Sequence, residues 1–355
     1  EITPRVIELE DRTVRLSGRC HISRIKLKIS GTFHYFRKDM EDEKSDNKWV
    51  LGATGYVGQL VTHRLFSERV KENWSGQLIT LGQKTLVPWI MERTNFHLFP
   101  LNSIPQMLLK RYRPSAIYHC ARMAGNSDRS RRIAARKGYA ANQRLIHLIK
   151  GAQTKIPIVY CSGTLMYGNT VDRIDEDATL LPIAYARAYE YAERPWVKAA
   201  ESGEMDVRIA RPGWILGPDS WFEHFFYKPA LRNGLVPIYG DGNQYMSIIS
   251  VEDCAGQLTH LMERGLPNQS ANLYGFEPIK QKDFALLVAQ FLETATMEIS
   301  ASETKNKFGK TVFEALTSST PVTTKHKDWR STYKPLHTDL KTLVESTIRR
   351  LQAKS

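Results

Sequence analysis

One heptapeptide near the start of the chain constrains the fold more than any other feature. Residues 52–58, Gly-Ala-Thr-Gly-Tyr-Val-Gly, follow a short apolar run at 48–51 and open a stretch with helical apolar spacing that extends to about residue 70. In such a strand–turn–helix, glycines permit a tight turn, close approach to a pyrophosphate, and packing of the helix on the strand. Phosphate charge meets free N–H groups at the positive end of the helix dipole. We therefore predict a dinucleotide-binding turn formed by Gly52, Thr54, Gly55, Tyr56, Val57 and Gly58.

The rest of the chain alternates between short apolar runs and longer helical patterns. We expect further strands at residues 77–81, 116–119, 156–161 and 207–210, and helices at 136–152 and 340–351. This alternation is typical of a doubly wound parallel sheet of the Rossmann type, hence of an α/β fold.

Three segments are expected along the chain. Residues 1–46 form a basic, β-rich N-terminal extension with a charged linker, in which 21–29 alternates like a strand. Residues 47–212 form the dinucleotide-binding domain, and 213–355 form a smaller mixed α/β substrate lobe interleaved with it. Ligands of open α/β sheets lie outside the carboxyl ends of the strands, so we expect the substrate between sheet and lobe.

The net charge of +13 is concentrated in two clusters. Residues 12–38 contain eight Lys or Arg and no Asp or Glu. The second cluster follows the strand that ends near Ala121, and consists of Arg122, Arg129, Arg131, Arg132, Arg136 and Lys137. Arginine suits bidentate binding of phosphate or carboxylate, which predicts a small anionic substrate, with a carrier- or nucleotide-linked substrate as one alternative. Arg122, Arg129 and Trp214 are the candidate substrate-binding residues; the alternative for both clusters is a solvated, solubilising surface.

Composition excludes several other classes. No apolar run approaches the ~20 residues needed to span a bilayer, so no membrane association is expected. The four cysteines, at 20, 120, 161 and 254, lack the spacing of a disulfide framework or a zinc site, so we expect no metal and a cytoplasmic location.

Several motifs together resemble the extended, in part atypical, short-chain dehydrogenase/reductase family of NAD(P)-dependent epimerases and dehydratases. They are the glycine motif, the strand ending His-x-Ala at 117–121, Asn142, the segment 160–168, the Arg-Pro to Gly-Pro turn at 209–218, and the Val-x-Asp-x-Ala pattern at 249–255. The resemblance covers roughly residues 47–355. It implies further cofactor-binding roles for Leu101, Ala121, Asn142 and Pro212.

The resemblance also implies the catalytic residues, with two departures from the family pattern. Tyr185 and Glu193 keep the spacing of a Tyr-x-x-x-Lys-x-x-x-Glu helix, but Tyr189 stands where the family lysine holds the nicotinamide ribose and lowers the tyrosine pKa. An unassisted tyrosine, with a pKa near ~10, is a poor base at neutral pH. The family hydroxyl position is Gly163; Ser162 and Thr164 flank it, and either could supply the hydroxyl, with Ser162 slightly favoured.

Cofactor choice is predicted from the end of the second strand. That strand runs into Gly82, Gln83 and Lys84 without the carboxylate that would bind the ribose hydroxyls of NAD. Because Lys84 can pair with a 2′-phosphate, we expect NADP(H) in preference to NAD(H).

Three functions are compatible with these residues. The first is an NADP(H)-dependent oxidoreductase, or an epimerase or dehydratase, in which Tyr185 exchanges the proton. The second is a non-redox cyclase, lyase or isomerase on the same fold. The third is an inactive cofactor-sensing or RNA-binding relative, although no nucleic-acid-binding motif is present and we do not expect nucleic acid as a partner. In this family the Tyr185 helix often forms a dimer interface, which makes a homodimer possible.

Overall fold

The computed structural model describes residues 46–125, 127–151 and 155–354. The predicted N-terminal strand and the basic stretch 12–38 lie outside the described residues. Within the described residues, no helix combines the length and apolar character needed to cross a membrane.

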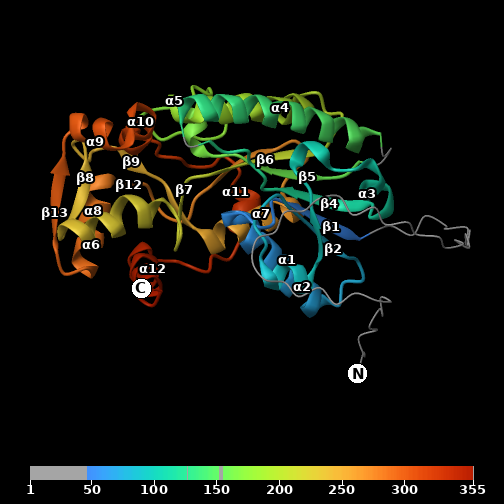
Figure 1. Ribbon diagram of the computed structural model, residues 1–355, viewed down its shortest axis with the longest axis horizontal. Coiled ribbons are helices and arrows are strands. Elements are labelled where there is room, and N and C mark those ends of the chain that lie inside the picture. Colours follow the sequence, from blue (N-terminus) through green and yellow to red (C-terminus); the bar gives the residue numbers. More distant parts are fainter. Residues whose placement is uncertain (1–45, 126, 152–154, 355) are drawn as a thin grey trace, which may run out of the picture. The chain divides into compact units, whose positions relative to one another are not determined.

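A seven-stranded parallel sheet forms the centre of the fold (Figure 1). Its order is β11-β6-β5-β4-β1-β2-β3. The strands are β1 (Asn47–Leu51), β2 (Leu78–Gly82), β3 (Asn95–Leu98), β4 (Pro114–His119), β5 (Ile158–Cys161), β6 (Val207–Pro212) and β11 (Ser270–Leu273). The predicted Rossmann α/β fold is confirmed. The strand order reverses between β1 and β4, and such a switch point opens a crevice at the carboxyl ends of the strands.

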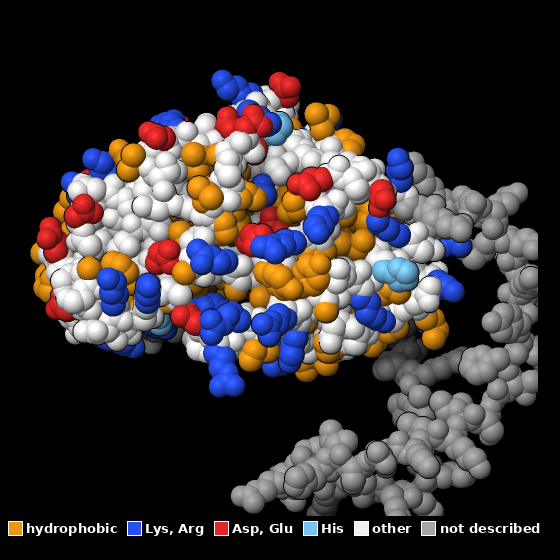
Figure 2. Space-filling view, turned by 90° about the horizontal axis from the view of Figure 1, so that it is seen from above, with side chains coloured by type: hydrophobic (Ala, Val, Ile, Leu, Met, Phe, Trp, Pro, Cys, Tyr) orange, Lys and Arg blue, Asp and Glu red, His pale blue; other side chains and the backbone are white. Residues whose placement is uncertain are grey.

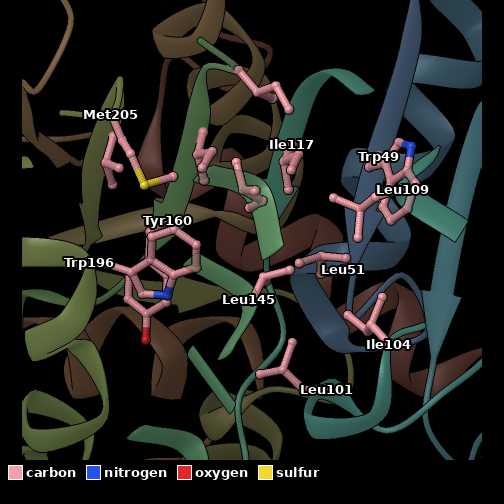
Figure 3. Packing of buried hydrophobic residues seen from close by; sticks show 14 of the residues in the cluster. Trp49, Leu51, Leu101, Ile104, Leu109, Ile117, Leu145, Tyr160, Trp196 and Met205 are labelled. Atoms are coloured by element: carbon pink, nitrogen blue, oxygen red, sulfur yellow. The ribbon is translucent and has the colours of Figure 1, made fainter. Parts of the chain in front are cut away.

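Helices cover both faces of this sheet. α4 (Asp128–Lys150) and α5 (Ala184–Glu201) pack together along one face, whereas α1 (Tyr56–Glu72) and α7 (Val251–Arg264) lie on the other (Figure 1). Alternation along β1 serves both layers, because Trp49 and Leu51 belong to the core under α4 and α5, and Val50 belongs to the opposite core. Figure 3 shows the first of these cores, in which Trp196 of α5 and Leu145 of α4 approach the sheet.

A second lobe follows β6. It contains β7 (Trp214–Leu216) paired with β10 (Ile248–Ser250), β8 (Leu235–Tyr239) paired with β13 (Ala295–Ile299), and β9 (Tyr245–Met246) paired with β12 (Ile279–Lys280). Its longer helices are α8 (Gln281–Phe291) and α12 (Leu340–Gln352), which pack on one another. Because β11 returns to the large sheet, the chain after Pro212 contributes to both lobes. The division at 212 stays a prediction.

Short elements connect these parts. They are α2 (Pro88–Arg93), a 3₁₀ turn (Leu101–Ser103), α3 (Gln106–Arg111), a second 3₁₀ turn (Thr164–Tyr167), a π-helical turn (Glu223–Tyr227), α6 (Lys228–Asn233), α9 (Ala301–Phe308), α10 (Lys310–Thr317) and α11 (Lys327–Ser331). α4 begins eight residues before the predicted residue 136, at Asp128. Ser127 and Ser130 form a reciprocal capping box there, and the pair lacks the Glu or Gln of the usual sequence signature.

Candidate active site

The glycine turn between β1 and α1 has the shape that a dinucleotide requires. Gly52 has a φ of +77°, and a Cβ atom added to it would lie 2.7 Å from the Cα of Ala121. Gly58 lies against the same turn, since its Cβ would stand 2.0 Å from the Gly52 carbonyl oxygen. Only glycine fits at these two positions. The turn therefore brings β1, α1 and the end of β4 into backbone contact.

The N-terminus of α1 is open to an anion. Gly55 is its N-cap, and among the described residues no side chain caps the helix and no acidic residue stands in its first turn. The backbone N–H groups of Tyr56, Val57 and Gly58 thus start a 17-residue helix without a competing carboxylate. Free N–H groups and the helix dipole suit a diphosphate. The residues present fit a nicotinamide dinucleotide.

Four of the predicted cofactor-binding residues surround a small cavity beside this turn. Its volume is about 40 Å³, and Gly52, Gln83, Leu101 and Ala121 line it. Lys84 is exposed and follows Gln83, but it does not line the cavity. Thr54 lies next to it, with its methyl group 3.0 Å from the position a Cβ of Gly82 would take. We refer to this space as the small cavity.

A larger space, the main cavity, lies between the sheet edge and the second lobe. Its volume is about 360 Å³. Eight residues predicted from the sequence line it, namely Tyr56, Arg122, Ser162, Thr164, Tyr185, Tyr189, Pro212 and Trp214. One cavity is therefore lined by the predicted catalytic tyrosine, both candidate hydroxyls and two candidate substrate-binding residues.

A buried carboxylate organises the hydroxyl segment of the main cavity. Glu193 of α5, 2% exposed, accepts a hydrogen bond from the Ser162 hydroxyl and pairs at 3.3 Å with Arg211 of β6. Burial raises the pKa of Glu193, while the charge of Arg211 opposes the rise. This network ties α5, β6 and the end of β5 together. It holds the Ser162 hydroxyl in place. Thr164, in the following turn, is only 3% exposed.

Two tyrosines and two arginines stack along α5. The rings of Tyr185 and Tyr189 lie 5.5 Å apart, edge to face. The guanidinium carbon of Arg122 is 4.2 Å from the centre of the Tyr189 ring, and that of Arg131 is 5.3 Å from the Tyr185 ring. Burial raises the pKa of Tyr189, and the charge of Arg122 acts in the opposite direction. Tyr189 thus presents an aromatic face where the family has a lysine.

Asn142 positions the active-site helix and does not line either cavity. Its side-chain amide donates to the backbone oxygen of Ala192 at 2.8 Å, and its Oδ1 lies 3.1 Å from Nε2 of His119. Asn142 is 2% exposed. The structure therefore joins α4, α5 and β4 through this residue, and its role in cofactor binding stays a prediction.

The basic cluster divides between cavity and surface. Arg129, Arg132, Arg136 and Lys137 are exposed on α4. Figure 2 views the molecule from above the layer of α4 and α5 in Figure 1, and Lys and Arg side chains are spread over this face. Arg129 lines neither cavity, so of the cluster only Arg122 lines the main cavity as predicted. Arg131 belongs to the cluster but was not selected as a site residue. Its guanidinium donates a hydrogen bond to the hydroxyl of Thr311 on α10, a contact that the sequence does not indicate.

Trp221 is a main-cavity residue that the sequence analysis did not select. Trp221 packs edge to face on Trp214 at 5.0 Å, and both line the main cavity. Trp214 and Trp221 flank the Gly-Pro turn at 217–218, which is the one local signal that could have indicated Trp221. Among the described residues, no group of three His, Cys, Asp or Glu side chains is placed to hold a metal ion.

The profile of the NAD dependent epimerase/dehydratase family matches residues 49–273, which is more than half of the chain. The chain belongs to this family. The resemblance inferred from the motifs is confirmed.

Curated relatives of this family member include epimerase family proteins of Mycobacterium bovis and Mycobacterium tuberculosis. Each is 28% identical over 164 residues, which is 45% of this chain. The match spans 53% of each relative, so the chain aligns with about half the length of these proteins.

Solved structures of epimerases and dehydratases share its fold. A dTDP-glucose 4,6-dehydratase from Bacillus anthracis in complex with NAD has a TM-score of 0.70 at 15% identity, covering 88% of this chain and 98% of that one. A UDP-glucuronic acid 4-epimerase from Bacillus cereus, in complex with UDP-glucuronic acid and NAD, has a TM-score of 0.68 at 17% identity, covering 87% and 100%.

Proposed function

We propose that the chain is an NADP(H)-dependent oxidoreductase or epimerase/dehydratase-like enzyme in which Tyr185 donates and accepts the proton. The observation that carries the proposal is that Tyr185, Ser162 and Thr164 line one cavity beside the glycine turn. A bound dinucleotide would supply hydride transfer. The chain's own residues would orient the substrate, and the Ser162 oxygen, whose proton is donated to Glu193, would accept a hydrogen bond from the reacting hydroxyl.

The proposed preference for NADP(H) over NAD(H) rests on the loop after β2. Gln83 lines the small cavity, Lys84 follows it, and neither carries the carboxylate that would bind ribose hydroxyls. The solved neighbours contain NAD. A lysine beside the ribose favours a 2′-phosphate by charge, so Lys84→Glu should shift preference from NADPH toward NADH.

We propose an anionic, nucleotide-linked substrate. Arg122 and Trp214 line the main cavity, and a guanidinium suits phosphate or carboxylate. Related folds hold UDP-glucuronic acid or UDP-glucose, which are suitable first probes. We further propose that the enzyme is cytoplasmic and forms a homodimer through α5, the helix that carries Tyr185.

A second candidate is a non-redox lyase or isomerase on the same fold. Tyr189 in the lysine position and Gly163 in the hydroxyl position favour it. Here the dinucleotide would be structural or absent.

Two measurements separate these functions. Titration with NADPH and NADH by fluorescence tests the cofactor, and product analysis with UDP-glucuronic acid and UDP-glucose tests turnover. Loss of turnover in Tyr185→Phe with unchanged dinucleotide affinity supports the proposal. Turnover that persists without any dinucleotide favours the second candidate, and unchanged turnover in Tyr185→Phe rejects the proton donor.

A further inference from the structure

Arg122 occupies the junction between the two cavities. It follows the end of β4 and lines both the small cavity, beside Gly52, and the main cavity, beside Tyr185. The carboxyl ends of β1 and β4 are the sheet edge at which a dinucleotide lies in open α/β folds. A side chain at this junction is therefore placed to contact both halves of the site.

Among the described residues, the Arg122 guanidinium stacks on an aromatic ring but pairs with no carboxylate. It stacks 4.2 Å from the centre of the Tyr189 ring, and within the described residues it takes part in no ion pair. Arg131 provides the contrast, because Asp128 and Thr311 bind its guanidinium. Stacking on an aromatic face fixes the plane of a guanidinium and leaves its N–H groups free for oxygen acceptors.

We propose that Arg122 makes the contact to the nicotinamide half of the dinucleotide that the family lysine would make from position 189, and that Tyr189 is the aromatic support that positions it. The inference rests on the proposed function, since it assigns a residue to dinucleotide binding. The cation then comes from the end of β4 instead of from α5. The replacement of lysine by Tyr189 is thereby coupled to an arginine at 122.

Dinucleotide binding by the whole chain in the absence of substrate tests this assignment. Arg122→Gln should weaken NADH and NADPH binding roughly ten- to hundredfold, the range expected for a lost charge-assisted hydrogen bond. ADP, which lacks the nicotinamide half, should bind Arg122→Gln as it binds the wild type. Arg129→Gln is the matched control, because it removes an exposed arginine of the same cluster that lines neither cavity.

A second-site variant tests the coupling. Tyr189→Lys introduced into Arg122→Gln should restore most of the lost dinucleotide affinity, with melting temperature and circular dichroism confirming that each variant is folded. Equal loss of ADP and NADH binding, unchanged NADH and NADPH binding in Arg122→Gln, or no rescue by Tyr189→Lys would each overturn the assignment while the proposed function stands. A wild-type chain that binds neither dinucleotide overturns the proposed function itself.

Discussion

The hydroxyl of Ser162 donates a hydrogen bond to the carboxylate of Glu193, which is 2% exposed. The same carboxylate pairs with Arg211 at 3.3 Å. One acid on α5 therefore holds both a candidate catalytic hydroxyl and the strand that leads into the second lobe. This relationship makes Glu193 a positioning residue for the main cavity.

Glu193→Gln should destabilise the protein strongly. Removing one partner of a buried pair costs about 3–5 kcal/mol, because Arg211 keeps its charge without compensation. Urea unfolding measures the change. Glu190→Gln is the control on the same helix: Glu190 pairs with Arg194 at the surface, the side chains being 21% and 52% exposed, and such i,i+4 pairs contribute about 0.3–0.5 kcal/mol. Equal losses in the two variants would contradict a structural role for the buried pair.

Gly52→Ala should close the glycine turn. A Cβ there would meet the Ala121 backbone at 2.7 Å, and the φ of +77° adds the left-handed penalty of about 1–2 kcal/mol. NADH and NADPH titration should show affinity lost beyond detection. Gly203→Ala carries the same kind of φ penalty, at +67°, with no atom within 4 Å, and should leave dinucleotide affinity unchanged. If Gly52→Ala behaves like Gly203→Ala in binding, the turn is not the diphosphate site.

Local patterns predicted the parts of this fold that short-range physics determines. The glycine turn, β1 and α1 were identifiable because apolar periodicity and the three glycines coincide within one short segment. β3 and the short helices α2 and α3 were not predicted. The six-residue helices are too short to show a period, and β3 is only partly buried.

Site residues could be predicted where they follow the spacing of the family motif. They could not be predicted where tertiary contacts determine which side chains meet. Tyr185, Ser162 and Tyr189 are brought together as their spacing implied. The stacking of Arg122 on Tyr189 could not be predicted, because it joins two elements 67 residues apart whose register depends on how α5 packs on the sheet. Arg129 and Arg131 look equivalent in sequence, and only the helical phase of α4 makes Arg129 exposed and Arg131 buried.

Asp253→Asn should destabilise the junction between α7 and the C-terminal segment. The Asp253 carboxylate is fully buried and accepts hydrogen bonds from Ser250 Oγ at 2.7 Å, Tyr333 Oη at 2.8 Å, and the backbone N–H groups of Leu336 and His337 at 2.7 and 3.1 Å. In asparagine an NH2 group replaces one of the accepting carboxylate oxygens and would face other donors. We expect this to lower the free energy of unfolding in urea by about 2–4 kcal/mol.

Asp339→Asn is the control for that substitution. Asp339 caps α12 from an exposed position, and asparagine caps helices as well as aspartate does. The same chemical change should therefore leave stability nearly unchanged there. Similar losses at 253 and 339 would show that the buried acceptor network is not what stabilises the junction.

His119 should make stability fall in mild acid. Burial lowers the pKa of His119 to about 4, and its Nε2–H donates to Asn142 Oδ1, so the folded ring stays neutral. An unfolded histidine titrates near ~6.5. Between these values the unfolded chain binds the extra proton, so this contribution is fully present above pH ~6.5 and is lost as pH falls toward 4, by about 3 kcal/mol in all.

Urea unfolding of wild type and His119→Gln at pH 7.5 and 4.5 measures this loss of stability. The wild type should lose more stability on acidification than the variant, because glutamine keeps a donor for Asn142 but binds no proton. Parallel pH profiles for the two proteins, or a ring that NMR shows protonated in the folded state at pH 5, would contradict a neutral His119 under α5.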